Sequence, residues 1–289
     1  MILGDCKQEF QYLDNMEEVN EQVTLNEFLV KTSYQTQITE PTDRKCSKPV
    51  SFGSGFIVEY DDTKLFVTAD HTVHLDDYEN DKEERTGKDY IVSIFNNYTP
   101  PGNFLSTVVT PLGGFYYMEK FHLDKPIDAP ELVDVSICKM KALNFQFPFL
   151  TDEVSFPEET IKAKQEKFSI KKECFSDPVS ETNYFVYGKV RTKLVETVRL
   201  ESIPTIKQGL RFISQAGDYL LFNYPEIIGD RLDWEGLSGS AVISEDGECV
   251  GVLCSVYENS KSVYVMPVSK VKMLIEVVIQ EEQLRKENA

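Results

Sequence analysis

Short runs of apolar and β-branched residues, separated by clusters of Gly, Pro, Asn and Asp, fill most of the chain between residues 48 and 268. Runs of about four to eight such residues, bounded by turn-forming residues, are typical of β-strands. Many short strands without helices between them favour an antiparallel barrel or sandwich, so the pattern predicts an all-β fold. The clearest runs are residues 55–58, 65–68, 90–95, 184–187, 219–222, 241–243 and 250–253.

A different pattern marks the C-terminal end of the chain, where apolar residues recur at helical spacing over residues 269–287. Ser269 can cap the start of this segment, and its last residues are polar. We therefore expect a C-terminal helix whose apolar face lies on the second half of the chain. Its apolar positions are Val271, Leu274, Ile275, Val278 and Ile279.

The limits of the structural units follow from where these patterns change. Residues 151–177 are rich in Glu and Lys and interrupt the strand pattern, which indicates a connection between two β-rich units. Residues 28–30 fit either an entering strand or the end of a short helix. The predicted units are an N-terminal extension (1–27), a first β-rich unit (28–150), a connection (151–180) and a second β-rich unit (181–289).

Composition narrows the classes of partner. The chain has 289 residues, 41% of them hydrophobic, and can bury a sizeable core. Its 48 acidic residues outnumber 30 basic ones, and the net charge of −18 disfavours binding to nucleic acid and to anionic membrane surfaces. No segment approaches the roughly 18 apolar residues of a membrane span, and the first residues lack the apolar run of a secretory signal. We therefore expect a cytoplasmic protein.

The six cysteines are sparse for a chain of this length, and none has the C-x-x-C spacing of a metal site. Three of them lie inside apolar runs, where a free cysteine usually serves as a small buried hydrophobe. In a reduced compartment all six are expected to be free thiols. They are Cys6, Cys46, Cys138, Cys174, Cys249 and Cys254.

Three local patterns supply the groups that a serine hydrolase needs. A hydroxyl is a poor nucleophile at neutral pH, so it requires a base, an acid that orients the base, and backbone donors for the oxyanion. His71 follows an apolar strand, and Asp134 opens a run of alternating residues. Ser238 lies between Gly236 and Gly239. Gly236 lets the backbone turn so that its own N–H and that of Ser238 point at one developing charge.

Each of these patterns also has a structural explanation. A histidine can be satisfied inside a core, an aspartate before a strand is ordinary turn chemistry, and Gly-x-Ser-Gly occurs in plain turns. What favours catalysis is the conjunction of all three in a β-rich chain. Their order, His, Asp, Ser, is that of chymotrypsin-type barrels and differs from the order in subtilisins and α/β-hydrolases.

With these motifs in place, the sequence resembles the trypsin-like serine protease superfamily, and more closely its bacterial glutamyl endopeptidase and high-temperature-requirement protease branches. The likeness spans residues 28–279 and rests on residues 53–58, 68–71, 134–137, 236–240, 251–253 and 263–268. It implies two packed antiparallel six-stranded β-barrels, chymotrypsin-like, with a C-terminal helix. His71 and Asp134 would come from the first barrel and Ser238 from the second, with an oxyanion hole from the N–H groups of Gly236 and Ser238. No metal or organic cofactor is implied.

Three residues depart from the family pattern. Asp70 replaces the usual alanine before the histidine, and Ala241 replaces a customary proline. Leu237 stands where secreted trypsins have a buried aspartate that pairs with a newly cut N-terminus, so activation by propeptide cleavage is not expected. The resemblance implies a serine endopeptidase acting on proteins or peptides. A catalytically silent protease fold that serves as a binding module remains the alternative, and a non-peptidase acyl hydrolase is a third.

The resemblance also implies a pocket for the side chain before the cut bond. Leu232 stands where trypsins carry an acid for Arg or Lys, and Leu253 stands where glutamyl endopeptidases carry a histidine. Val256 replaces a glycine at the pocket mouth and would shorten the pocket. We expect a small or medium apolar residue, such as Ala, Val or Leu, before the cut. The implied pocket residues are Leu232, Asp233, Cys254, Ser255, Val256 and Ser262.

An acidic run follows the candidate histidine. His71 and His74 with Asp70, Asp76 and Asp77 could ligate a metal, but His-x-x-His suits neither the helical i,i+4 pair nor one strand face. A solvated surface insertion over residues 76–84 is the simpler interpretation, and such an insertion could also contact a substrate or a regulatory protein.

Overall fold

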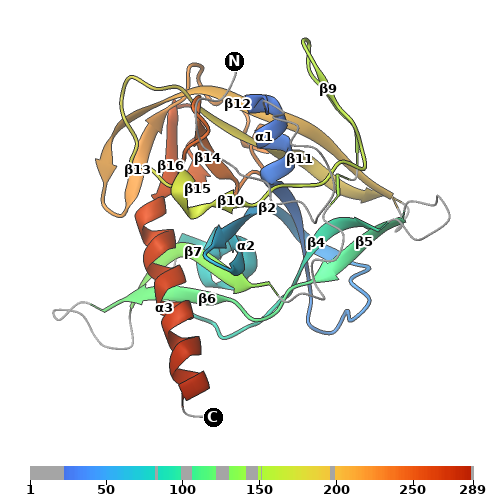
Figure 1. The fold of residues 1–289 in the computed structure, drawn as a ribbon, viewed down its shortest axis with the longest axis vertical. Coiled ribbons are helices and arrows are strands. Elements are labelled where there is room, and N and C mark those ends of the chain that lie inside the picture. The colour runs from blue at the N-terminus through green and yellow to red at the C-terminus, as the bar shows by residue number, and fades with distance from the viewer. Residues whose placement is uncertain are drawn as a thin grey trace, which may run out of the picture.

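A computed structural model describes residues 23–81, 84–98, 106–121, 130–140, 149–150, 152–195 and 199–287. β-strands dominate these residues, and the all-β class predicted from the sequence is confirmed (Figure 1). The helices among them are α1 (Leu25–Thr32), α2 (Asp70–Val73) and α3 (Val268–Glu287). Short 3₁₀ helices are η1 (Leu75–Asp81), η3 (Lys172–Cys174) and η4 (Arg231–Asp233).

The first half of the chain forms an eight-stranded sheet in the order β5-β4-β1-β2-β3-β7-β6, to which β10 adds by pairing in parallel with β2. The expected first barrel had six strands. Here the connection contributes a strand of its own, and no pairing within the described residues joins β5 to β6. The strands are β1 (Ser33–Thr39), β2 (Pro49–Tyr60), β3 (Thr63–Thr68), β4 (Ile91–Tyr98), β5 (Ser106–Pro111), β6 (Tyr116–Lys120), β7 (Glu131–Lys139) and β10 (Ile170–Lys171).

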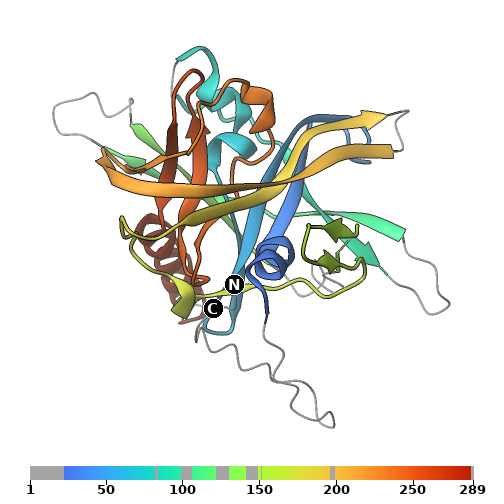
Figure 2. The same ribbon diagram turned by 90° about the horizontal axis from the view of Figure 1, so that it is seen from above.

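The second half forms a closed barrel in the order β11-β12-β13-β16-β15-β14, with β14 pairing back to β11. Its longest hairpin, β11–β12, crosses the molecule as a ribbon in Figure 2. Closure removes free strand edges from this half. The strands are β11 (Tyr184–Val195), β12 (Arg199–Ala216), β13 (Tyr219–Asn223), β14 (Ala241–Ser244), β15 (Cys249–Val256) and β16 (Ser262–Pro267).

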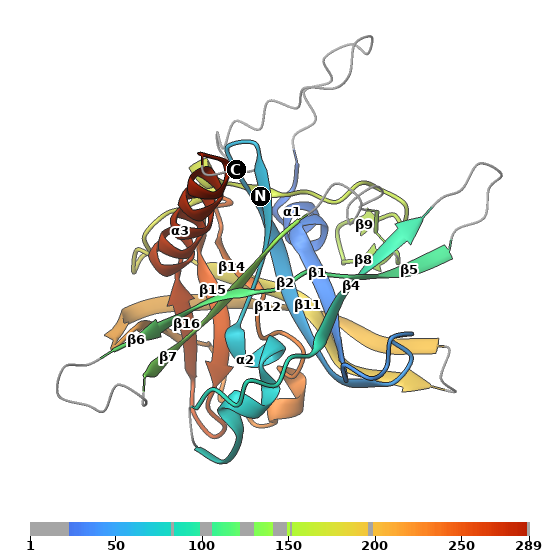
Figure 3. The ribbon, with the colours of Figure 1, turned by 90° about the horizontal axis from the view of Figure 1, so that it is seen from below.

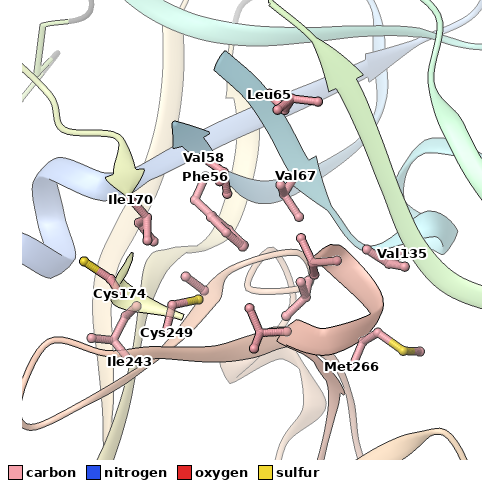
Figure 4. Close-up of a cluster of buried hydrophobic side chains, with 14 of the residues drawn as sticks. Phe56, Val58, Leu65, Val67, Val135, Ile170, Cys174, Ile243, Cys249 and Met266 are labelled. Carbon is pink, nitrogen blue, oxygen red and sulfur yellow. The ribbon is translucent and has the colours of Figure 1, made fainter. Parts of the chain in front are cut away.

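One hydrophobic cluster joins the two halves. Figure 4 shows Phe56 and Val67 of the first sheet facing Met266 and Ile243 of the barrel. All four side chains are fully buried. Burying a side chain of this size stabilises the fold by about 1.5–3 kcal/mol. The two halves therefore share one core, which fixes their relative positions.

The helices follow their sequence signals. Residues 28–30 belong to α1, which Thr24 caps by accepting a hydrogen bond from the N–H of Glu27 (3.1 Å). The predicted C-terminal helix is confirmed as α3, which packs its apolar face against β6, β7, β15 and β16. Figure 3 shows α2 below α1, toward the lower edge of the view. No helix among the described residues is long and apolar enough to cross a membrane.

The connection between the halves is ordered by short elements. β8 (Val154–Ser155) pairs with β9 (Thr160–Ile161), and β10 and η3 follow. Cys46, Cys138, Cys249 and Cys254 are free thiols, as predicted. Cys174 is disulfide-bonded, so the prediction of a free thiol is wrong there; its partner lies outside the described residues. Spacing alone does not reveal disulfide pairing, which explains the miss.

Candidate active site

His71 is delivered by a strand that is buried on both faces. Leu65, Phe66 and Val67 of β3 have no exposed surface, and the strand ends at Thr68. The chain then turns through Ala69 into α2, which carries His71 in its first turn. The strand cannot shift without disturbing the core, whereas the imidazole keeps 28% of its surface exposed. The histidine is thus rigidly mounted and accessible, as the sequence predicted.

Asp134 lies inside β7, three residues after the strand begins at Glu131, rather than opening it as expected. The register between β6 and β7 shifts at this point. Met118 pairs with Val133 and the adjacent Tyr117 pairs with Ser136, so the two residues of β7 between them have no partner on β6. Asp134 and the residue after it therefore form a β-bulge. Bulges redirect side chains and are frequent beside active sites.

Asp134 and His71 form a hydrogen-bonded pair. The imidazole Nδ1 lies 2.9 Å from Oδ2 and 3.0 Å from Oδ1, and the backbone N–H of His71 also donates to Oδ1 (3.0 Å). Because a carboxylate only accepts, Nδ1 carries the proton and Nε2 is left as the basic nitrogen. The carboxylate side chain is only 7% exposed.

The electrostatics of the pair favour its charged form. Burial acts to lower the pKa of His71, but the charge and hydrogen bond of Asp134 outweigh it, so the pKa is raised above its ordinary 6.5. Burial acts to raise the pKa of Asp134, yet the hydrogen bonds and charge of His71 hold it below 3.8. Asp134 therefore stays ionised at neutral pH and can stabilise an imidazolium.

Ser238 lies in a tight turn that only glycines allow. Gly236 and Gly239 have φ angles of +100° and +91°. A Cβ on Gly239 would lie 2.1 Å from the carbonyl oxygen of Ser54, and one on Gly236 would lie 2.4 Å from that of Lys189. The carbonyl of Ser238 accepts a hydrogen bond from the N–H of Ser54 (2.9 Å). This hydrogen bond holds the turn against β2 of the first sheet.

The hydroxyl of Ser238 donates to the carbonyl of Cys254 (3.2 Å). The thiol of Cys254 in turn donates to the carbonyl of Asp134 (3.4 Å). Cys254 therefore contacts both residues: its carbonyl accepts a hydrogen bond from Ser238, and its thiol donates one to Asp134. Within the described residues, however, no hydrogen bond joins the Ser238 hydroxyl to His71.

Two backbone N–H groups beside the Ser238 side chain differ from their neighbours in their hydrogen bonding. In the part of the chain that the structure describes, the N–H groups of Gly236 and Ser238 have no hydrogen-bond acceptor, whereas those of Leu237 and Gly239 are bonded. The carbonyl of Gly236 is held by the hydroxyl of Ser54 (2.6 Å). Sequence reasoning used Ser54 only as part of a motif. Its two contacts to the turn become visible only when both halves are folded.

The implied pocket residues lie on two structures beside this turn. Cys254, Ser255 and Val256 belong to β15, and Ser262 begins β16, which pairs with it. Leu232 and Asp233 belong to η4, where Leu232 is 49% exposed. A hydrogen bond from the N–H of Arg231 to Glu258 (3.0 Å) links η4 to the turn between the two strands.

The carboxylate of Asp233 is bound by the guanidinium of Arg191, with Nη2 at 2.8 Å and Nε at 3.1 Å. Nη2 of Arg191 also lies 2.9 Å from Asp230, so two acids share this guanidinium.

The residues considered as metal ligands are otherwise engaged. No group of three or more His, Cys, Asp or Glu that could hold a metal occurs among the described residues. His74 faces Asp70, with Nδ1 2.7 Å from Oδ1. Asp77 is only 3% exposed and accepts hydrogen bonds from Thr86 and Arg85, so the interpretation as a solvated run is wrong there. Arg85 was missed, although a cation at the end of an acidic run is a signal for such a pair.

Comparison with known proteins gives distant structural likenesses only. No family model and no curated protein matches the sequence. A serine endoprotease from Yersinia pestis is 14% identical, with a TM-score of 0.43; the match covers 88% of this chain but spans only 65% of that protein. The apo form of the MamO protease domain from Magnetospirillum magneticum is 12% identical, with a TM-score of 0.43, over 86% of this chain and 98% of that one.

Proposed function

We propose that the chain is a trypsin-like serine endopeptidase that cleaves peptide bonds through an acyl-enzyme on Ser238. The observation that carries the proposal is the Asp134–His71 pair, in which the carboxylate binds both the ring Nδ1 and the backbone N–H of the histidine. That arrangement fixes the tautomer with a basic Nε2, as a general base for a serine nucleophile requires. The Ser238 hydroxyl and the backbone carbonyl of Asp134 both form hydrogen bonds with Cys254, which supports the proposal.

In the proposed mechanism each group has one role. Ser238 attacks the scissile carbonyl, while His71 takes the hydroxyl proton and later returns it to the leaving amine. Asp134 stabilises the imidazolium. The free N–H groups of Gly236 and Ser238 bind the oxyanion. In this mechanism the Ser238 hydroxyl has to leave the Cys254 carbonyl and donate to Nε2 of His71 instead. Catalytic hydrogen bonds are often unformed until substrate binds.

The hydrogen bond from the Ser238 hydroxyl to the Cys254 carbonyl is the observation that favours the second candidate, a catalytically silent binding module. A serine that stays on the Cys254 carbonyl would not be activated by His71. The two candidates differ in whether the serine reacts with an electrophile.

A fluorophosphonate probe separates the two candidates, because it labels only a serine activated by a base. We expect a stoichiometric adduct on the peptide that contains Ser238, located by mass spectrometry, and none in Ser238→Ala. Labelling should be lost when His71→Ala removes the base. No adduct on the folded protein, or an adduct elsewhere, would support the silent module instead.

We also expect activity without cleavage of the N-terminal segment. Leu237 is fully buried in the apolar cluster of the barrel, where its side chain meets Gly188, so no carboxylate awaits a freed amino group. The measurement compares activity before and after limited proteolysis, with N-terminal sequencing. Activity that arises only after cleavage, with a new terminus bound near Leu237, would contradict this expectation.

The predicted cleavage preference is for a small or medium apolar residue before the cut. Asp233 is neutralised by Arg191, which weakens any attraction for Arg or Lys. A diverse peptide library, digested and read by mass spectrometry, measures the preference. Dominant Arg, Lys or Glu at that position would overturn it. In that case Asp233→Asn, compared with the exposed Asp177→Asn, would show whether Asp233 is responsible.

A further inference from the structure

Asp70, the residue before the proposed base, is a fully buried carboxylate. Its Oδ1 accepts a hydrogen bond from the hydroxyl of Ser136 and lies 2.7 Å from Nδ1 of His74. Its Oδ2 accepts from the hydroxyl of Tyr78 (2.7 Å) and from Nη1 of Arg85 (2.7 Å). A buried charge is tolerated only when it is paired and fully hydrogen-bonded, and this one is.

Arg85 is the permanent cation of this group. Its Nη1 also binds Asp77 (2.9 Å), its Nε binds Glu119 (3.1 Å), and its guanidinium lies over the ring of Tyr117 at 3.9 Å. The side chain is 16% exposed. Arg85 therefore ties α2 to η1 and to β6, two elements that the sequence places on either side of it.

The first two residues of α2 are both clamped onto β7. Asp70 accepts from Ser136, and His71 binds Asp134 two residues earlier on the same strand. A four-residue helix has too few internal hydrogen bonds to hold its own orientation. We propose that Asp70 and Arg85 are positioning residues, a buried ion pair that holds α2 so that the His71 imidazole stays in register with Asp134. This inference rests on the proposed peptidase function.

The charge of Asp70 also acts on the base. It is one of the groups that raise the pKa of His71, after Asp134. Removing that charge should therefore lower the pKa of His71. The charged and titratable groups around His71 are Asp134 on β7, Asp70 on its own helix, Tyr78 of η1 with ring centroids 5.9 Å apart, Cys254 of β15, which bonds the Asp134 carbonyl, and Arg231 of η4, which opposes the shift.

The kinetic test uses two variants with matched controls. Asp70→Asn and Arg85→Met each break the buried pair, whereas Asp76→Asn and Lys88→Met break the nearby, more exposed pair of the same loop (3.0 Å). We expect kcat to fall about 10- to 100-fold in the first two, as small misplacements of a catalytic group do, with KM within about twofold. The two controls should keep wild-type values. Rates are normalised to sites titrated with the fluorophosphonate, so a loss of folded protein is not counted.

The double variant Asp70→Asn/Arg85→Met tests whether the two residues act as a pair. Arg85→Met alone leaves Asp70 without its counterion, and removing both partners relieves that penalty. The double variant should therefore be more active than the product of the two single effects, although Asp77 and Glu119 still lack the guanidinium. Independent, multiplying effects would overturn the pairing.

A second measurement does not depend on activity at all. In the Ser238→Ala protein, NMR titration of the histidine ring protons follows the three histidines of the chain directly. Asp70→Asn should lower the pKa of His71, and Asp76→Asn should leave it unchanged. If the wild-type protein proves inactive while this shift is seen, the peptidase proposal fails and the coupling of Asp70 to His71 stands. An unchanged His71 pKa together with unchanged kcat would overturn the inference.

Discussion

Replacing Ser238 by alanine is expected to abolish hydrolysis of a protein substrate, with a fall in kcat on the order of 10⁶-fold. The oxyanion donors and the binding surface remain in this variant, and they account for a residual acceleration of about 10³–10⁴ over water. The fold should be unaffected, because within the described residues the hydroxyl makes a single hydrogen bond, to the Cys254 carbonyl at 3.2 Å. Single-turnover kinetics measures the loss, and thermal unfolding checks the fold.

Ser240→Ala is the matched control for this substitution. Ser240 lies two residues further along the same turn, is 1% exposed, and its hydroxyl has no hydrogen-bond partner among the described residues. Removing an unsatisfied buried hydroxyl costs little stability, so this variant should remain active. Wild-type turnover by Ser238→Ala would rule out the acyl-enzyme mechanism. Equal losses in both variants would point to damage to the turn rather than to a missing nucleophile.

The parts of the site that sequence could predict are those encoded locally. The apolar run of β3 and the residues after it predict where His71 emerges, because strand and turn signals lie side by side in the chain. Gly236 and Gly239 predict the turn around Ser238, since positive φ angles favour glycine. The helical spacing of apolar residues predicts α3, because the whole signal lies within one segment of the chain.

The parts that escaped prediction depend on pairing between distant segments. The bulge at Asp134 exists because of the register between β6 and β7, which residues 131–139 do not specify by themselves. β10 joins the first sheet by pairing with β2, more than a hundred residues earlier in the chain. In the same way, the burial of Asp70 follows from Arg85, fifteen residues further on. A carboxylate beside other acids looks solvated in sequence until its counterion is located.

Asp134→Asn is expected to lower kcat by about 10⁴-fold while keeping the geometry of the cleft. An amide can donate to Nδ1, so the proton moves to Nε2, and the imidazole can no longer accept the proton of Ser238. The backbone N–H of His71, which donates to Oδ1 at 3.0 Å, can still find an acceptor in the amide oxygen. Steady-state kinetics on a fluorogenic peptide measures the loss. The exposed Asp177→Asn is a suitable control and should keep full activity.

The pH dependence of kcat/KM should distinguish an Asp134 that acts on His71 from an aspartate with a merely structural role. The neutral imidazole is the base, so kcat/KM of the wild type should fall as the pH drops through the pKa of His71, which lies above 6.5. In Asp134→Asn the two contributions of Asp134 that raise this pKa are lost and burial remains, so the acid limb should move to lower pH.

The stability of the folded protein should also depend on pH through Asp134 and His71. The depressed pKa of Asp134 contributes stability above about pH 4 that is lost on acidification, and the raised pKa of His71 contributes stability below about pH 6.5 that is lost on alkalinisation. The difference in unfolding free energy between the wild type and Asp134→Asn should therefore be largest between those two values. An acid limb that stays in place, with a stability difference independent of pH, would show that Asp134 does not act on His71.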